Sequence, residues 1–279
     1  LTGVKSLPLF TLDDSDRNRT SPFAFTGNKF EFRMVGSSQS IGLANAVTNA
    51  IVADVFHDFA DKLEGAADVE SVVREIIAET WREHRRVIFN GNNYSAEWAV
   101  EAERRGLYNL PSMVDAAPAF TAEKNIAMFT RTKVFTEAEC RSRCEILLET
   151  YAKHIHIDAS TMLAMVSRSI LPASYEYLAR IGKAEALVEH NGCACASAKA
   201  SVEKLCVTID RTAGAMEALR RALNELDSAH LGESVRAQKF RDLARGEMAA
   251  LREAADELER QVPQTYWPFP DYCDLLFDL

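Results

Sequence analysis

The chain has 279 residues, of which 47% are hydrophobic and 26% charged, as in an ordinary globular protein of one large or two smaller domains. Its formal net charge of -9 argues against a general nucleic-acid binder, because phosphate binding requires clustered excess lysine and arginine. No apolar run reaches the length of a membrane span, and the N-terminus lacks a signal-peptide pattern. We therefore expect a cytoplasmic protein that binds neither nucleic acid nor membranes.

Two aromatic-rich extended runs near the N-terminus predict a β-hairpin over residues 20–35. They are joined by Gly27-Asn28, a dipeptide that tolerates positive φ. Because side chains alternate along a strand, the second run has one aromatic face and one charged face. The charged face carries a cation, an anion and a cation, namely Lys29, Glu31 and Arg33.

This charged row has two interpretations. A row of alternating charge suits a solvated strand. Against that interpretation, the opposite face consists of large aromatic residues that need a deep core, and Arg17 and Arg19 lie just ahead of the partner strand. Several cations around one carboxylate would suit anionic substrates and a metal ion.

Helical periodicity follows the hairpin. Apolar residues recur every three or four positions over residues 45–63 and 69–87, which predicts two amphipathic helices. A shorter helix is expected over 95–105, followed by an irregular, proline-punctuated segment over 110–118. The residues expected to face inward on the first two helices are Val47, Ile51, Val55 and Phe59, then Val72, Val73, Ile76, Ile77 and either Thr80 or Trp81.

The second half of the sequence predicts helices throughout. Thr136 to Glu139 form a capping box, which opens a helix that buries Cys140, Cys144, Leu147, Leu148 and Tyr151. We expect Asp158 to start a further helix, kinked near Pro172. Alternating three- and four-residue apolar steps predict an antiparallel helical hairpin over 195–262, with its turn at His230 to Gly232. An aromatic tail, 263–279, is expected to dock on the body or on a neighbouring subunit.

Cysteine and histidine patterns give no strong metal signal. Six cysteines are too few for a disulfide scaffold, and Cys193 and Cys195 have no second pair at zinc-ligand spacing, so free thiols are favoured. His154 and His156 would place two imidazoles on one face of an extended segment, without a third ligand nearby. We therefore favour no metal site at either pair.

Several segments resemble glutamine synthetases, and in particular the type III branch of that family. Asn18 to Ser21, followed by Lys29 to Arg33, resembles the paired Asn-Arg-Ser and Arg-Ile-Glu-x-Arg motifs of these enzymes. The resemblance covers essentially the whole chain and corresponds to the C-terminal part of the family. Further segments that resemble the type III branch are 16–38, 97–107, 145–149 and 266–277.

The resemblance implies an α+β fold that is predominantly α-helical in this fragment. In that fold, the hairpin over 20–35 would be the C-terminal part of a catalytic β-sheet. Residues 1–118 would complete the catalytic domain, and residues 119–279 would form a helical C-terminal region with the hairpin and tail.

The resemblance also implies ATP-dependent joining of ammonia to glutamate through γ-glutamyl phosphate, with Mg²⁺ or Mn²⁺. Glu31 matches the family's metal-binding glutamate on this strand, and its oxygen ligand suits such an ion. Arg33 matches the arginine that contacts the substrate glutamate, and Arg19 the arginine that steadies the transferring phosphoryl group. Lys29 stands where the family has an arginine near the nucleotide, and Arg17 is assigned to the nucleotide from proximity alone.

Oligomeric rings with active sites shared between identical subunits are a further implication. The family's N-terminal domain and early metal-binding glutamates are absent from these residues, so we expect the fragment alone to be inactive. Two alternatives stay open. The activity would be that of a related glutamate–amine or glutamate–cysteine ligase, or the chain would be a non-catalytic ring-assembly fragment.

Overall fold

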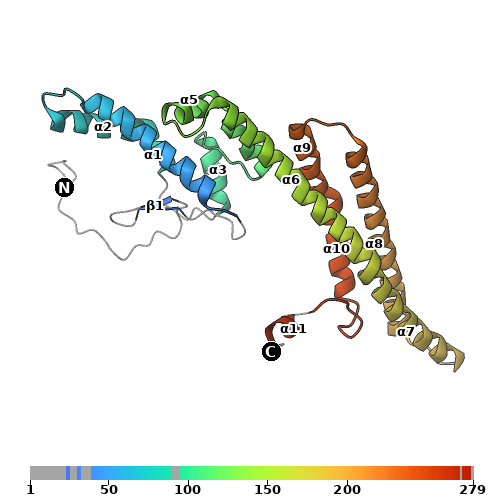
Figure 1. The fold of residues 1–279 in the computed structure, drawn as a ribbon. Coiled ribbons are helices and arrows are strands. Elements are labelled where there is room, and N and C mark those ends of the chain that lie inside the picture. Colours follow the sequence, from blue (N-terminus) through green and yellow to red (C-terminus); the bar gives the residue numbers. More distant parts are fainter. Residues whose placement is uncertain (1–22, 26–29, 33–38, 89–94, 271, 278–279) are drawn as a thin grey trace, which may run out of the picture. The chain divides into compact units, whose positions relative to one another are not determined.

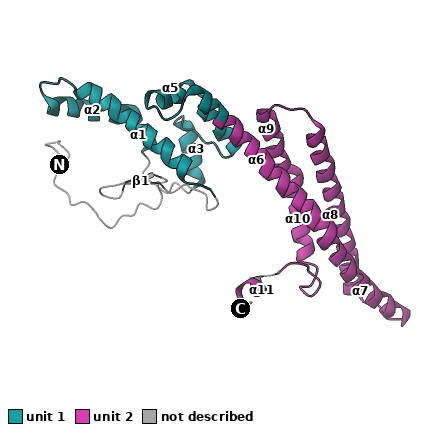
Figure 2. Cartoon of the chain, in the orientation of Figure 1, with its two compact units in different colours: residues 1–142 teal, residues 143–279 magenta. Residues whose placement is uncertain are grey.

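The computed structural model describes residues 23–25, 30–32, 39–88, 95–270 and 272–277. The chain divides into two compact units, residues 1–142 and 143–279 (Figure 2). The predicted domain limits, 1–118 and 119–279, stay a prediction. In the described part of the chain, no helix combines the length and the apolar character that crossing a membrane requires.

The first unit begins with two short strands. β1 (Phe23–Phe25; labelled in Figure 1) and β2 (Phe30–Phe32) pair antiparallel, with Ala24 opposite Glu31. Helices make up the other regular elements described in this unit. These are α1 (Gly42–Leu63), α2 (Val69–His84), η1 (Arg85–Val87), α3 (Ala96–Arg104), α4 (Met113–Ala116), η2 (Ala117–Thr121) and α5 (Glu123–Arg131).

The predicted α+β class with a catalytic β-sheet is wrong. In the described residues, strand pairing is limited to three residues in each of two strands, and no third strand joins them. A two-stranded ribbon of this length does not form an independently stable layer, whereas helical periodicity continues through the described residues that follow it. The described chain is therefore helical, with one minimal strand pair.

The core of the first unit lies where α1 meets α5. Ala50 of α1 is 1% exposed and packs in one cluster with Phe129, Phe135 and Cys140. The rings of Phe129 and Phe135 meet edge to face, with their centroids 5.1 Å apart. A small residue at position 50 lets these rings approach the helix closely.

The predicted inward faces of α1 and α2 are only partly correct, since Val47 of α1 packs against the core cluster as predicted but other members of the set do not. Ile51 and Val55 of α1 are exposed, because α1 turns Ala50 rather than these residues toward α5. On α2, Ile76 is buried as predicted, but Ile77 and Trp81 are 56% and 63% exposed. Sequence periodicity identified amphipathic helices but not the angle at which each helix meets its neighbours.

A long helical run begins in the last residues of the first unit and supplies the first helices of the second. α6 (Glu137–Met165) continues through a π-helical segment, η3 (Val166–Ile170), into α7 (Leu171–His190). The predicted capping box is confirmed, because the Thr136 backbone N–H donates to Glu139 across 2.7 Å and the Glu139 N–H to the Thr136 hydroxyl across 3.3 Å. The buried residues Cys140, Cys144 and Leu148 also follow the prediction.

The prediction that Asp158 starts a new helix is wrong, since α6 passes through it without a break. The irregularity instead lies at η3, just before Pro172. Proline has no N–H to donate and its ring crowds the carbonyl four residues earlier, here that of Arg168. The wider π turn, in which Leu171 N–H donates to the Val166 carbonyl, accommodates the proline without ending the helix.

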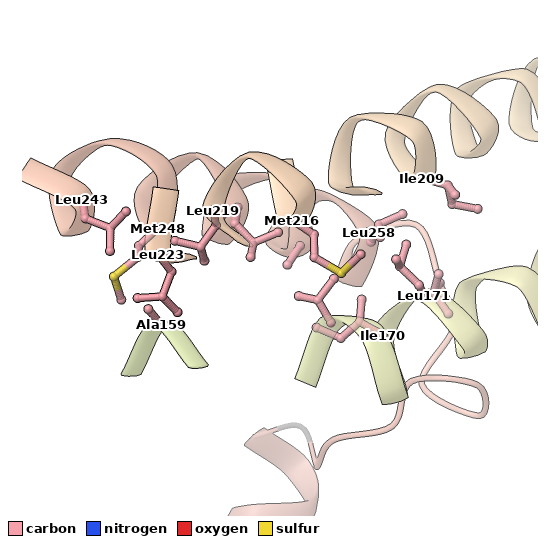
Figure 3. Close-up of a cluster of buried hydrophobic side chains, with 14 of the residues drawn as sticks. Ala159, Ile170, Leu171, Ile209, Met216, Leu219, Leu223, Leu243, Met248 and Leu258 are labelled. Atoms are coloured by element: carbon pink, nitrogen blue, oxygen red, sulfur yellow. The ribbon is translucent and has the colours of Figure 1, made fainter. Parts of the chain in front are cut away.

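A helical hairpin occupies the predicted positions. α8 (Ala196–Ser228) leads through a turn to α9 (Glu233–Leu243), a second π-helical segment η4 (Ala244–Met248) and α10 (Ala249–Glu259). Figure 3 shows Leu219 and Leu223 of α8 in the same buried cluster as Leu243 of α9 and Leu258 of α10. The apolar repeat thus forms the core of this unit.

One position interrupts that apolar repeat. Thr212 is fully buried, and its hydroxyl donates to the Thr208 carbonyl across 2.8 Å. The hydrogen bond within the helix satisfies the hydroxyl, so the core tolerates a polar residue there.

The aromatic tail packs against the second unit. Tyr266, Trp267 and Phe269 lie half-buried against the core cluster, and the ring of Tyr266 lies 5.5 Å from that of Tyr177 on α7. A last short helix, α11 (Tyr272–Phe277), lies within the tail. Gln264 donates to Asp274 across 2.9 Å.

Candidate functional site

The residues predicted to act in catalysis lie at the N-terminal end of the chain. Glu31 is on β2, directly across the strand pair from Ala24. Arg17, Arg19, Lys29 and Arg33 lie outside the described residues. The grouping of these five residues into one site therefore stays a prediction.

A cluster of charges links α3 to the end of α2 and η1. Arg105 donates to the backbone carbonyls of Arg86 and Ile88 across 3.2 and 2.7 Å, and its guanidinium lies 5.7 Å from the ring of Trp98. Glu101 accepts hydrogen bonds from both Arg104 and Arg105. These two guanidiniums, that of Arg104 first, lower the pKa of Glu101 to about 2.

A second cluster links α5 to α1. Arg131 donates through Nε to Asp54 across 2.6 Å and through Nη1 to Asp58 across 2.7 Å. Its hydrogen bond is the main cause that holds the pKa of Asp58 below its usual value. This two-armed contact fixes the register of one helix against the other.

Both clusters connect one helical segment to another. Each guanidinium has carboxylate or carbonyl partners from the chain itself, and neither cluster contains a hydroxyl, thiol or imidazole as a reacting group. Sequence reasoning missed both clusters. The signals in the sequence were two spacings of four residues on a helical face, Asp54 with Asp58 and Glu101 with Arg105.

The second unit contains an apolar cavity of about 500 Å³. Met162 of α6, Val166 of η3, Met248 of η4 and Trp267 of the tail contribute to its lining. Both π-helical segments thus border the cavity, in line with the frequent occurrence of π turns at functional sites. Sequence reasoning missed this cavity, because its walls come together only when the tail folds back.

The rim of the cavity is polar. Arg252 donates to Asp256 across 2.6 Å, and Glu259 lies on the next turn of α10. The side chains that line the cavity include no serine, cysteine, histidine or lysine. The apolar part of its lining is therefore suited to holding an apolar group.

The two histidines do not form a metal site. They lie on helix α6, so the prediction that an extended segment carries them is wrong. Residues two apart on a helix point to different sides, and His156 contacts Asp227 across 3.2 Å and the ring edge of Phe240. Within the described ranges, no three histidine, cysteine, aspartate or glutamate side chains are grouped so that they would hold a metal ion.

Comparison with known proteins shows that the chain is similar to a family model and to several glutamine synthetases. Residues 72–188, from α2 to α7, match the family model described as the glutamine synthetase C-terminal domain. A type-3 glutamine synthetase of Dictyostelium discoideum is 35% identical over 99% of this chain and 38% of its own length. A glutamine synthetase of Butyrivibrio fibrisolvens is 35% identical over 97% of the chain and 39% of its own length.

A third relative agrees with the first two. A glutamine synthetase of Bacteroides fragilis is 31% identical over 99% of the chain and 39% of its own length. The predicted resemblance to glutamine synthetases of type III is thereby confirmed. The chain spans about two fifths of the length of these relatives.

Proposed function

We propose that the chain, a homologue of type-3 glutamine synthetases that corresponds to their C-terminal part, belongs to an enzyme that joins ammonia to glutamate with hydrolysis of ATP. The observation that carries this proposal is the similarity itself, which extends over 97–99% of the chain in three relatives. Glutamate, ammonia and ATP are the proposed substrates. The cytoplasm is the proposed compartment.

In this proposal the N-terminal residues of the chain bind the charged groups of the substrates. Arg33 holds the carboxylate of glutamate through its planar fork, and Arg19 stabilises the charge that develops on the transferring phosphoryl group. Lys29 and Arg17 contact the nucleotide phosphates. These roles rest on the motif that surrounds these residues.

Glu31 is the proposed ligand of a divalent metal ion. Carboxylate oxygens are the ligands that Mg²⁺ and Mn²⁺ take in proteins, so this residue fits the role chemically. The ion, when bound, neutralises charge on the phosphate oxygens. Because one carboxylate does not hold such an ion alone, we propose that other parts of the enzyme supply further ligands.

A shared site of this kind supports two further proposals. The chain by itself is inactive, since one carboxylate does not hold a catalytic ion alone. The enzyme is a homo-oligomer, which the exposed apolar side chains on α1 and α2 favour. Phe56 is 65% and Trp81 is 63% exposed, and large apolar side chains of this kind are frequent at subunit interfaces.

The same observation favours one alternative function. The chain would then be a non-catalytic part that assembles subunits into a ring through these apolar faces. A related glutamate–amine ligase is a second alternative, because the groups that select ammonia over an amine are not among the residues assigned here.

One set of measurements on the full-length protein separates these functions. We expect ATP-dependent formation of γ-glutamyl hydroxamate from glutamate and hydroxylamine, and faster phosphate release with ammonia than with methylamine or cysteine. Faster release with methylamine or cysteine would establish the amine or cysteine ligase instead. A full-length protein that forms rings in electron micrographs but produces no hydroxamate would support the assembly role.

A further inference from the structure

The loop between α7 and α8 carries two thiols that the proposed function does not use. Cys193 and Cys195 are both free and exposed, and Ala194 alone separates them. Cys206 is half-buried, and Cys140 is buried in the core. Among the cysteines whose surroundings the structure describes, this pair is the most accessible to a reagent in solution.

The end of α7 fixes the backbone of Cys193. Gly192 takes a left-handed conformation, with φ of 72°, and its N–H donates to the Glu189 carbonyl across 2.9 Å. The N–H of Cys193 then donates to the Val188 carbonyl across 3.1 Å. These two bonds form a Schellman motif, which ends the helix and holds Cys193 at its tip.

The start of α8 fixes Cys195. This residue is the N-cap, and its carbonyl accepts from the Lys199 N–H across 3.2 Å. Its sulfur lies 3.4 Å from the hydroxyl oxygen of Ser197. That hydroxyl, together with the backbone N–H groups of Ala198 and Ser197, lowers the pKa of the Cys195 thiol. A thiol that ionises more readily supplies more of the thiolate, which is the reacting form of cysteine.

The spacing of the two residues permits a bond between them. Consecutive Cα atoms are about 3.8 Å apart, so the Cα atoms of Cys193 and Cys195 are separated by at most about 7.6 Å. Disulfides span Cα separations up to about 6.8 Å, a range that this short segment reaches by rotation about the backbone of Ala194. A methyl side chain at position 194 offers little steric resistance to that rotation.

We propose that Cys193 and Cys195 form a dithiol site that a low-molecular-weight disulfide, such as oxidised glutathione, converts reversibly to an intramolecular disulfide. The Cys195 thiolate attacks one sulfur of the glutathione disulfide, which forms a mixed disulfide and releases one glutathione thiolate. The Cys193 thiolate then attacks the Cys195 sulfur and releases the second glutathione. In sum, two protein thiols are oxidised and one glutathione disulfide is reduced to two thiols, which take up the two protons.

A metal ion is a poorer match to this pair. Two thiolates supply half of a tetrahedral zinc site, and the described residues add no further histidine, cysteine or carboxylate to complete a group of three. Disulfide exchange needs no third residue. The oxidant, and not a metal, is therefore the proposed reaction partner.

The sequence around the pair allows a direct test on the full chain. Trypsin cleaves after Lys183 and Lys199, and the resulting peptide, residues 184–199, contains these two cysteines and no others. The protein is incubated with oxidised glutathione, alkylated with iodoacetamide and digested. We expect this peptide to be unalkylated and lighter by two hydrogen atoms, and to become doubly alkylated if dithiothreitol is added before the alkylation.

Single variants identify the role of each sulfur. Cys193→Ser should accumulate a mixed disulfide with glutathione at position 195, whereas Cys195→Ser should lose the fast reaction. Cys206→Ser is the matched control and should react like the parent protein. In the parent, Cys195 should be alkylated several-fold faster than Cys206 at neutral pH, and the midpoint of its rate–pH profile should lie at a lower pH than that of Cys206.

Three results would overturn the proposal. The peptide would remain doubly alkylated after exposure to oxidised glutathione, or the disulfide would join two chains, or Cys195 and Cys206 would be alkylated at equal rates with the same pH dependence. None of these measurements uses ligase activity. The dithiol proposal therefore stands or falls separately from the proposed function.

Discussion

Arg131, at the end of α5, donates to the carboxylate of Asp58 on α1 across 2.7 Å, and its other arm holds Asp54 one helical turn away. This contact joins residues more than seventy positions apart in the sequence. It lies beside the core cluster that contains Phe129 and Ala50. The ion pairs and the aromatic contacts thus fix the same helix crossing.

The first prediction concerns this contact. Arg131→Ala should lower the melting temperature of the chain, because it leaves two carboxylates on α1 without their shared cation. Arg141→Ala is the matched control, since Arg141 pairs only locally with Glu137 on its own helix among the contacts described for it. Differential scanning calorimetry in low salt measures both variants. Equal melting temperatures for the two would show that Arg131 contributes no more than a local surface pair.

The second prediction concerns acid pH. The pKa of Glu101 is lowered from 4.5 to about 2 by Arg104 and Arg105. A carboxylate whose folded-state pKa is depressed stabilises the fold above its unfolded pKa. That contribution is lost as the pH falls from about 4.5 toward 2. Glu101→Gln should therefore flatten the fall in stability across this window.

Urea unfolding at several pH values between 6 and about 2 checks this prediction. Glu103→Gln serves as control, because Glu103 lies on the exposed side of the same helix. The interpretation fails if both variants follow the pH dependence of the parent. It also fails if they flatten that dependence equally.

The third prediction concerns the core of the helical hairpin. Leu219 is fully buried between the helices, so Leu219→Ala should reduce the free energy of unfolding by about 2–5 kcal/mol. Val207 lies on the same helix but is 69% exposed, so Val207→Ala should change it by no more than about 0.5 kcal/mol. Denaturant unfolding followed by circular dichroism measures both. Similar losses for the two variants would mean that α8 does not bury the face described here.

The fourth prediction concerns the tail. Trp267 packs on the core cluster, with its ring 6.4 Å from that of Phe269. Trp267→Ala should free the tail and increase the rate of chymotrypsin cleavage within residues 266–277 several-fold. Leu275→Ala, at a residue that is 66% exposed, should leave the rate unchanged. Unaltered cleavage of the Trp267 variant would mean that the tail is held by other contacts.

The fifth prediction concerns the proposed ligase and uses the full-length enzyme. Glu31→Ala should reduce turnover by at least about 100-fold, because loss of a metal ligand removes charge stabilisation worth several kcal/mol. It should also weaken Mn²⁺ binding, as measured by electron paramagnetic resonance. Arg33→Lys should mainly raise KM for glutamate, because the lysine lacks the planar fork.

Glu103→Gln is the control for this pair of variants and should keep the parent kinetics. Normal turnover and unchanged Mn²⁺ binding in Glu31→Ala would remove the metal assignment. A fall in kcat with unchanged KM in Arg33→Lys would move Arg33 from substrate binding to the phosphoryl transfer itself.

The sequence by itself determined the local features of this protein. The capping box at Thr136, the turn at Gly232 and the buried stripe of the helical hairpin all follow from short-range patterns. Such patterns are read correctly because they depend on residues within one or two helical turns. The motif around Glu31 likewise predicted the resemblance to glutamine synthetases from consecutive residues.

Tertiary structure decided what depends on contacts between distant segments. It determined that α1 turns Ala50 and not Ile51 toward α5. It also determined that a π turn before Pro172 lets the helix continue through the proline. It also brought Trp267 back to line the cavity beside Met248. Each of these outcomes depends on how closely two surfaces approach, and hydrophobic periodicity along one segment carries no information about the shape of the other.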